Sequence, residues 1–334
     1  MLHAQDWPIS HRRLGIGDPL HPCQSLFVVG IYGWRQVSLK GRLVHAYLIF
    51  AHKNLDQLPR LIDRLDSGAA TFFLHIDKTT DTSPFEPALA KLRTLENIHF
   101  VERHRCPWSA FGLIEAQRSA MEAALAAGRS THFMMLTGQD YPLRPAHEID
   151  SFFDAHRDTS FIGFFFGNTK RRRKQLRMQR YKDRNMYFAG RHRRVSSELL
   201  NKVGIKREIP GGLRPVKGWA EFTVTPEAAE YALRFYQQNP RYVRFWRHAR
   251  HPDEYFWHTI LLNSPLRDRV ANITLRYTPF IRPGAAHTAT FRKQDLEELK
   301  KKSSEYFFAK KFDVTRDPDI LDLLDRDLLR ITNP

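Results

Sequence analysis

Two adjacent carboxylates, Asp253 and Glu254, follow a proline in the stretch HPDEYFWHTILLNSP, residues 251–265. Pro252 suits the first turn of a helix, where its missing N–H costs no hydrogen bond. The helix dipole favours negative charge in that turn, so one interpretation is simple capping. The other is that one carboxylate is held against the apolar residues that follow, as a general base that accepts a proton. The residue types and their spacing leave both interpretations open.

A second group of polar side chains follows three apolar, β-favouring runs of the chain. His52 ends the first run, Asp77 and Lys78 end the second, and Gln139 and Asp140 follow the third. An acid in such a position is often only a turn or capping residue. In open α/β sheets, however, ligands bind at the carboxyl ends of the strands. Three polar clusters in equivalent positions therefore predict a binding site at this edge of the sheet.

The elements that must position these residues alternate between strand and helix. Short apolar runs predict strands buried on both faces, and apolar residues at helical spacing predict the helices between them, the first with Asn54 as its N-cap. This order predicts an α/β fold with a mostly parallel sheet flanked by helices. After a Gly/Pro-rich link, a further strand at 220–225 and a helix opening at Pro226 are expected. The earlier strands are expected at 44–52, 71–78, 98–102 and 131–138, and the helices at 54–67, 85–94 and 109–128.

The bulk composition narrows the function classes. The chain has 334 residues and a formal net charge of +17, which indicates an anionic partner. Its two cysteines cannot form a disulfide framework, so we expect a reducing, cytoplasmic environment. The apolar run 25–34 is too short to span a membrane and lacks a signal-peptide cleavage site, so we expect a soluble protein or one peripheral on the inner face of the membrane. Motifs of ATPases, dinucleotide enzymes and zinc hydrolases are missing.

Two regions stand apart from this core. Residues 1–43 mix Pro, His, Gly and Arg without a period, which predicts a poorly ordered N-terminal extension. The run 170–194 is densely basic with interleaved Tyr and Phe. It could be a solvated loop, a nucleic-acid surface, or a surface for an anionic membrane or acidic glycan.

Five blocks of the sequence, taken in order, resemble a known family. The blocks are AYLIFAHKNLDQLPRLIDRLD, FFLHIDK, LTGQDYPLRP, HPDEYFWHTILLNS and FFAKKFD. They are similar to motifs of the core-2/I-branching β-1,6-N-acetylglucosaminyltransferase and peptide O-xylosyltransferase family. The run HTILLNS resembles the xylosyltransferase branch and its bacterial relatives more than the animal branching enzymes. The resemblance covers residues 44–313 and implies a GT-A type fold. Its nucleotide-binding half would be 44–150 and its acceptor-binding half 151–313, followed by a C-terminal tail or helix at 314–334.

The resemblance also implies an activity. It would be an inverting transfer of xylose or N-acetylglucosamine from a UDP-sugar to a hydroxyl of a glycan or protein. The family's catalytic base maps to Glu254, with Asp253 beside the acceptor. The family is understood to stabilise the departing diphosphate with basic side chains, so no metal or other cofactor is expected. Lys311 maps to its phosphate-binding lysine and Arg276 is a second candidate, although from the residues alone Lys310 and Lys311 could be an ordinary solvated pair.

The remaining site residues are placed by the same resemblance. Asp77 and Lys78 would lie at the uridine, with His52 at the same edge and Trp108 in a donor-side block. Gln139 and Asp140 would face the donor sugar or the acceptor. In VKGWAEFTVT, residues 216–225, Glu221 and Phe222 stand where the family has a tryptophan pair, which weakens an aromatic platform for a sugar ring. A nucleic-acid-binding module, which we disfavour, and an inactive relative are the competing interpretations.

Overall fold

The structure is a computed structural model, and it describes residues 44–128, 130–165, 184–188, 191–195, 209–247, 249, 251–280 and 288–331. The predicted N-terminal extension, residues 1–43, lies outside the described residues. So does most of the basic run 170–194, of which only the backbone of the antiparallel hairpin β8 (Arg184–Phe188) and β9 (Arg191–Val195) is described. Within the described part of the chain, no helix has the length and apolar character needed to cross a membrane.

The centre of the fold is a seven-stranded sheet with the strand order β12-β6-β11-β4-β1-β2-β3. The middle strand, β1, runs parallel to β2 on one side and to β4 on the other, and β3 continues in parallel beyond β2. Only β11 runs antiparallel to its neighbours β4 and β6, and β12 is parallel to β6. The predicted α/β class with a mostly parallel sheet is confirmed. The strands are β1 (Val44–Ala51), β2 (Ala70–Ile76), β3 (Ile98–Phe100), β4 (Ser130–Thr137), β6 (Ser160–Phe161), β11 (Thr223–Val224) and β12 (Val270–Ala271).

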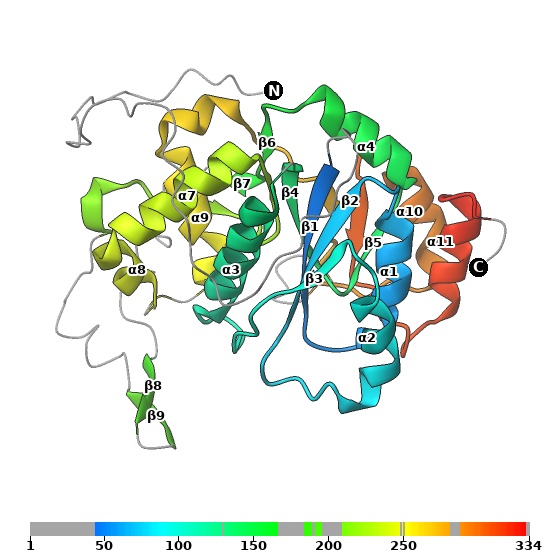
Figure 1. The fold of residues 1–334 in the computed structure, drawn as a ribbon, viewed down its shortest axis with the longest axis horizontal. Coiled ribbons are helices and arrows are strands. Elements are labelled where there is room, and N and C mark those ends of the chain that lie inside the picture. Colours follow the sequence, from blue (N-terminus) through cyan, green and yellow to red (C-terminus); the bar gives the residue numbers. More distant parts are fainter. Residues whose placement is uncertain are drawn as a thin grey trace. The chain divides into compact units, whose positions relative to one another are not determined.

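Helices cover both faces of this sheet because its strands are apolar on both faces. Along β1, Tyr47 and Ile49 belong to the core on one side, whereas Ala46 and Leu48 belong to the core on the other. Figure 1 shows α1, α2, α10 and α11 on one side and α3, α7, α8 and α9 on the other. The helices are α1 (Leu58–Leu65), α2 (Glu86–Arg93), α3 (Gly112–Ala127), α4 (Ala146–Ala155), α7 (Pro226–Gln238), α8 (Pro240–Arg247), α9 (Phe256–Leu262), α10 (Leu296–Lys302) and α11 (Asp319–Asp327).

Local sequence signals mark the ends of two helices. Gly128 ends α3 with a positive φ (68°), which favours glycine, and Thr225 caps α7 by accepting a hydrogen bond from the backbone N–H of Ala228. Asn54 lies at the predicted N-cap position, but its side chain makes no capping hydrogen bond. Its backbone is left-handed (φ 49°), a 3-10 turn precedes α1, and its side-chain amide donates to Asp313 at 2.7 Å. The side chain of Asn54 therefore binds Asp313, which is distant in the sequence, instead of a nearby backbone N–H of the helix.

Two smaller sheets bring distant segments onto the carboxyl edge of the main sheet. In the first, β14 (Phe308–Lys310) lies between β13 (Arg276–Tyr277) and β5 (Asp140–Pro142), with Lys310 opposite Asp140. In the second, β7 (Phe164–Phe165) pairs with β10 (Lys217–Gly218). The predicted strand at 220–225 is confined to β11. Short 3-10 turns complete the described chain: η1 (Leu55–Gln57), η2 (Ser83–Phe85), η4 (Pro210–Gly212), η5 (Pro252–Glu254), η6 (Pro265–Arg269) and η7 (Lys293–Asp295).

Candidate active site

The carboxyl ends of three neighbouring parallel strands lie together in the sheet. Ala51 at the end of β1 is in register with Ile76 of β2, and Phe50 is in register with Thr137 of β4. The backbone N–H of Asp77 also donates to the carbonyl of Ala51 at 2.8 Å. The polar residues that follow each strand therefore start from one edge of the sheet.

Asp77 is buried and uses both carboxylate oxygens within the chain. Oδ1 accepts from the backbone N–H and the hydroxyl of Thr79, at 2.7 and 2.6 Å, and Oδ2 accepts from the backbone N–H of Cys106 at 2.9 Å. Burial alone would raise the pKa of Asp77, but these hydrogen bonds lower it below its usual range. Asp77 thus fastens the loop after β2 to the loop before α3. The neighbouring Lys78 side chain is exposed.

Gln139 and Asp140 lie below the surface. Asp140 is fully buried, and its Oδ2 accepts from the backbone N–H and the hydroxyl of Thr137 at 2.6 and 2.7 Å. Gln139 is also buried and donates to the carbonyl of Phe312 at 3.2 Å. Both residues therefore bind neighbouring strands together beneath the edge.

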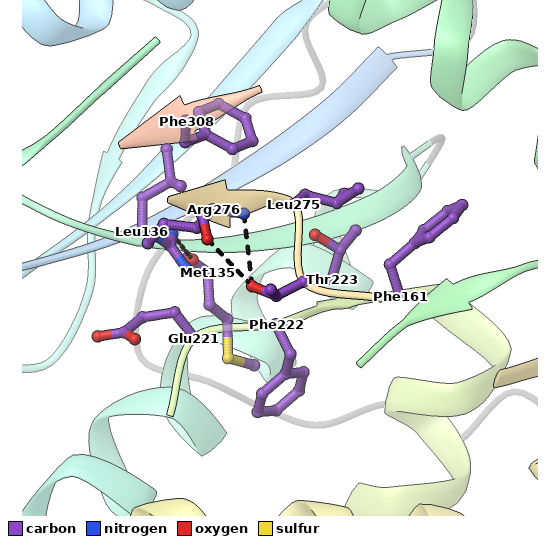
Figure 2. Close-up of a pocket in the computed structure, with 10 residues that line it drawn as sticks. Met135, Leu136, Phe161, Glu221, Phe222, Thr223, Leu275, Arg276 and Phe308 are labelled. Carbon is purple, nitrogen blue, oxygen red and sulfur yellow. Dashed lines mark hydrogen bonds between the residues drawn. The ribbon is translucent and has the colours of Figure 1, made fainter. Parts of the chain in front are cut away.

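Arg276 is buried in the same layer. Its Nε ion-pairs with Asp140. Its Nη2 donates to the carbonyl of Met135 at 2.8 Å, as Figure 2 shows. Arg276 and Glu221 line a small pocket between β4, β11 and β13. The guanidinium is therefore already occupied by partners inside the chain.

The two lysines of the FFAKKFD block have different surroundings. Lys310 is buried and ion-paired with Glu221. Burial alone would raise the pKa of Glu221, but the charges of Lys310 and Arg276 outweigh it and hold this pKa at about 2. Lys311 is half-buried, and burial together with the charges of Lys310 and Lys53 lowers its pKa. No carboxylate of the described residues forms an ion pair with Lys311, so its ammonium is open to an added anion.

His52 belongs to the surroundings of Lys311. Burial, followed by the charges of Lys53 and Lys311, lowers the pKa of His52, while Asp77 acts in the opposite direction. Lys53 is itself paired with Asp313 at 2.8 Å. The residues after β1 and after β14 thus meet in one positively charged region.

Glu254 and Asp253 lie in the turn η5, directly before α9. Neither carboxylate caps α9, which begins after Tyr255 without a side-chain capping bond. Glu254 is instead ion-paired with Lys217 at 2.7 Å, and both side chains remain about a third exposed, at 31% and 33%. The capping interpretation therefore does not describe this pair of acids.

Asp253 carries an unusual carboxyl group. Its Oδ1 atom is inaccessible to solvent and has no hydrogen-bond partner among the described residues. Burial, followed by the charges of Glu254 and Glu221, raises the pKa of Asp253 to about 7, against the attraction of Lys310. The carboxyl groups of η5, Glu221 and Lys310 of β14 therefore belong to one electrostatic cluster.

Trp108 projects beside the turn that carries Glu254. Its side chain is 69% exposed and meets the ring of His251 edge-on at 4.8 Å. The backbone N–H of His251 donates to the hydroxyl of Ser109 at 3.1 Å, which joins the two loops.

Gly112 starts α3 against the carbonyl of Arg105, where an added Cβ would lie 1.9 Å from that oxygen. Only glycine fits this approach.

Residues 45–303 match the family model described as "Branch: Core-2/I-Branching enzyme". The chain belongs to the Core-2/I-branching enzyme family. Among similar proteins, this family member is 25% identical over 311 residues to xylosyltransferase 2 of Rattus norvegicus, covering 87% of the chain and 34% of the relative. It is 25% identical over 300 residues to xylosyltransferase 2 of Homo sapiens (84% and 33%), and 22% identical over 298 residues to xylosyltransferase 1 of Rattus norvegicus (84% and 35%).

The family member spans about a third of the length of these curated relatives. A solved structure, S. aureus TarS 1-349 in complex with UDP, also matches, with 12% identity and a TM-score of 0.37. That match covers 87% of this chain and 67% of TarS.

The structure adds one residue that the sequence did not single out. Lys217, in the Gly/Pro-rich link, is the ion-pair partner of Glu254. Lys217 and Glu221 lie at the two ends of a five-residue segment, the linking segment 217–221, which therefore pairs with Glu254 at one end and with Lys310 at the other. No local signal marked Lys217, because its partner Glu254 lies on a distant segment of the chain. No group of three or more His, Cys, Asp and Glu in the described part of the chain is arranged to hold a metal.

Proposed function

We propose that this chain is an inverting glycosyltransferase that transfers xylose or N-acetylglucosamine from a UDP-sugar to an acceptor hydroxyl. Membership in the Core-2/I-branching enzyme family and the similarity to xylosyltransferases support the reaction class. The observation that carries the proposal is the position of Glu254. Its carboxylate is partly exposed, held by Lys217, and linked electrostatically through Asp253 and Glu221 to Lys310 of β14.

In the proposed reaction, Glu254 accepts the proton of the acceptor hydroxyl while that oxygen attacks the anomeric carbon. The new carbon–oxygen bond forms on the face opposite UDP, and the bond to the diphosphate breaks with its electron pair leaving on the phosphate oxygen. The configuration of the anomeric carbon therefore inverts. Lys217 keeps the carboxylate of Glu254 in place, and Asp253 lies beside it on the acceptor side.

Lys311 is proposed to stabilise the charge that develops on the departing diphosphate. A half-buried ammonium among other cations gains more from an incoming anion than a fully solvated lysine does. Lys310 supports it from the buried side through Glu221. We propose that these cations take the place of a divalent metal, so that the transferase needs no cofactor.

The other predicted residues divide into two groups. His52, Lys78 and Trp108 are proposed to contact the nucleotide-sugar directly, since each side chain lies near the carboxyl edge or beside the turn of Glu254. Asp77, Gln139, Asp140 and Arg276 are buried and hydrogen-bonded within the chain, so we propose that they shape the floor on which the donor rests.

The test is a hydrolysis and transfer screen with UDP-xylose, UDP-N-acetylglucosamine and other UDP-sugars, with and without EDTA. We expect UDP release with one of the two named donors, unchanged in EDTA. In Glu254→Gln, UDP should still raise the melting temperature, while turnover falls by about 10²- to 10⁴-fold, the range for loss of a general base. Glu227→Gln, which alters a surface ion pair with Arg269, is the matched control. Activity lost in EDTA would refute metal independence, and full activity in Glu254→Gln would refute the assignment of the base.

A further inference from the structure

Two aromatic side chains from separate segments, Phe165 and Phe280, contact the ring of Trp219 next to the candidate active site. The ring of Trp219 stacks on Phe280 at 6.0 Å between centroids and 29° between planes. Phe165 meets the same indole edge-on at 5.7 Å and 62°. Phe165 is 40% exposed and Phe280 is 48% exposed. Single exposed apolar residues are ordinary, but a contiguous group beside charged residues marks a binding surface. We call these three rings the aromatic platform.

The middle ring of the aromatic platform, the indole of Trp219, is held in place by the backbone at Gly163. The backbone N–H of Trp219 donates to the carbonyl of Gly163 at 3.1 Å. A Cβ on Gly163 would lie 2.9 Å from Cδ1 of Trp219, so the indole rests directly on this backbone. On the next residue, a Cβ at Gly218 would lie 2.2 Å from the ring of His258 in α9. The platform is therefore preorganised rather than a loose surface contact.

The aromatic platform borders the proposed catalytic carboxylate. In the β7–β10 pair, Phe165 lies directly opposite Lys217, and opposed residues of a ladder project to the same side. Lys217 reaches Glu254 at 2.7 Å. Trp219 follows two residues after Lys217 and precedes Glu221 by two. An occupant of the platform would thus have its polar edge beside Lys217 and Glu254.

We propose that the aromatic platform binds a pyranose ring of the acceptor, which makes Phe165, Trp219 and Phe280 determinants of acceptor specificity. A pyranose presents apolar C–H groups on its faces and hydroxyls around its edge. Its face can cover an aromatic ring while one edge hydroxyl approaches a nearby carboxylate. This inference rests on the proposed function and names its acceptor class.

The test measures saccharide binding directly, by saturation-transfer NMR on the full chain in the presence of UDP. The probes are methyl β-glycosides of xylose, galactose, N-acetylglucosamine and N-acetylgalactosamine, with a sugar-free Ser-Gly peptide for comparison. We expect saturation of ring C–H protons for at least one glycoside. Phe280→Ala and Phe165→Ala should each weaken that binding by about three- to tenfold, in line with the loss of one aromatic contact. Phe280→Trp should restore it.

The controls separate this proposal from the proposed function. Leu95→Ala removes an exposed apolar side chain elsewhere, 42% exposed, and should bind the glycoside as the wild type does. UDP-induced thermal stabilisation, measured on the same variants, shows whether the fold and the nucleotide site are intact, and UDP-sugar hydrolysis is measured on the wild type. If hydrolysis is missing in the wild type, the proposed function fails while saccharide binding still tests the platform. The platform proposal is overturned if no glycoside binds, if only the peptide binds, or if both alanine variants bind like the wild type.

Discussion

The buried layer around Arg276 and the turn around Glu254 both contain carboxylates and basic side chains. The two regions differ in how far these groups are buried and in how completely they are paired. In the buried layer, Arg276 is paired with Asp140 and Lys310 with Glu221. Near Glu254, an oxygen of Asp253 has no hydrogen-bond partner among the described residues, and Glu254 is paired with Lys217 but stays about a third exposed. Lys311 forms no ion pair with a carboxylate of the described residues. Burial and pairing together, rather than residue type, separate charges that hold the fold together from charges that are available to a substrate.

The largest effect that would test this comparison is expected from Arg276→Met. Removing one partner of a buried ion pair leaves Asp140 uncompensated, which typically costs about 3–5 kcal/mol. The measurement is the free energy of unfolding from urea denaturation. Arg269→Met breaks only the exposed pair with Glu227 and should change the same quantity by less than about 1 kcal/mol. Equal losses in the two variants would contradict the division into structural and available charges.

A smaller effect, and on activity rather than stability, is expected from Lys311→Met. If this ammonium stabilises the departing diphosphate, turnover of the UDP-sugar should fall by about 10²- to 10³-fold. The melting temperature without ligand should stay the same or rise, because a cation crowded by Lys310 and Lys53 has been removed. Lys301→Met, on the exposed face of α10, is the matched control. A variant that unfolds more easily but turns over normally would place Lys311 with the structural charges instead.

The smallest effect concerns Asp253→Asn and depends on pH. The folded chain raises the pKa of Asp253 from its ordinary value to about 7, so the folded state keeps a proton that the unfolded state loses between about pH 4 and 7. The stability of the wild type should therefore fall as pH rises through this window, and the asparagine variant should lack that loss. Above pH 7 we expect the variant to be more stable, by on the order of 1–3 kcal/mol.

Unfolding at a series of pH values measures this difference, with Asp268→Asn as the control because the Asp268 side chain is 93% exposed. A stability difference that does not change between pH 4 and 8 would show that Asp253 titrates normally. Lys311 would then be the one charged group of the comparison whose lack of a partner in the described part of the chain still sets it apart from the buried layer.

The sequence predicted the parallel core well because its strands and helices are determined locally. The apolar run that became β1 and the glycine that ends α3 both act through neighbouring residues. The position of the polar residues at the carboxyl edge of the sheet could be predicted from the order of the strands. Asn54 could not be predicted, because its partner Asp313 is distant in the sequence.

The candidate site was only partly readable for the same reason. The PDE triplet marked Glu254 and Asp253, but the pairing with Lys217 depends on a contact between segments. Equally, nothing in the local sequence distinguishes Arg276, which is buried against Asp140, from an arginine that faces a ligand. The aromatic platform combines rings from three segments, so sequence spacing could not reveal it.

The close approach of Gly218 to His258 has a consequence for redesign of this enzyme family member. A Cβ at Gly218 would collide with the imidazole, so this position of the linking segment requires glycine. The two ends of the segment are ion-paired with Glu254 and with Lys310. For the proposed reaction, libraries that seek new acceptors should vary Phe165 and Phe280 and leave residues 217, 218 and 221 unchanged, so that the proposed base and Lys310 keep their relative positions.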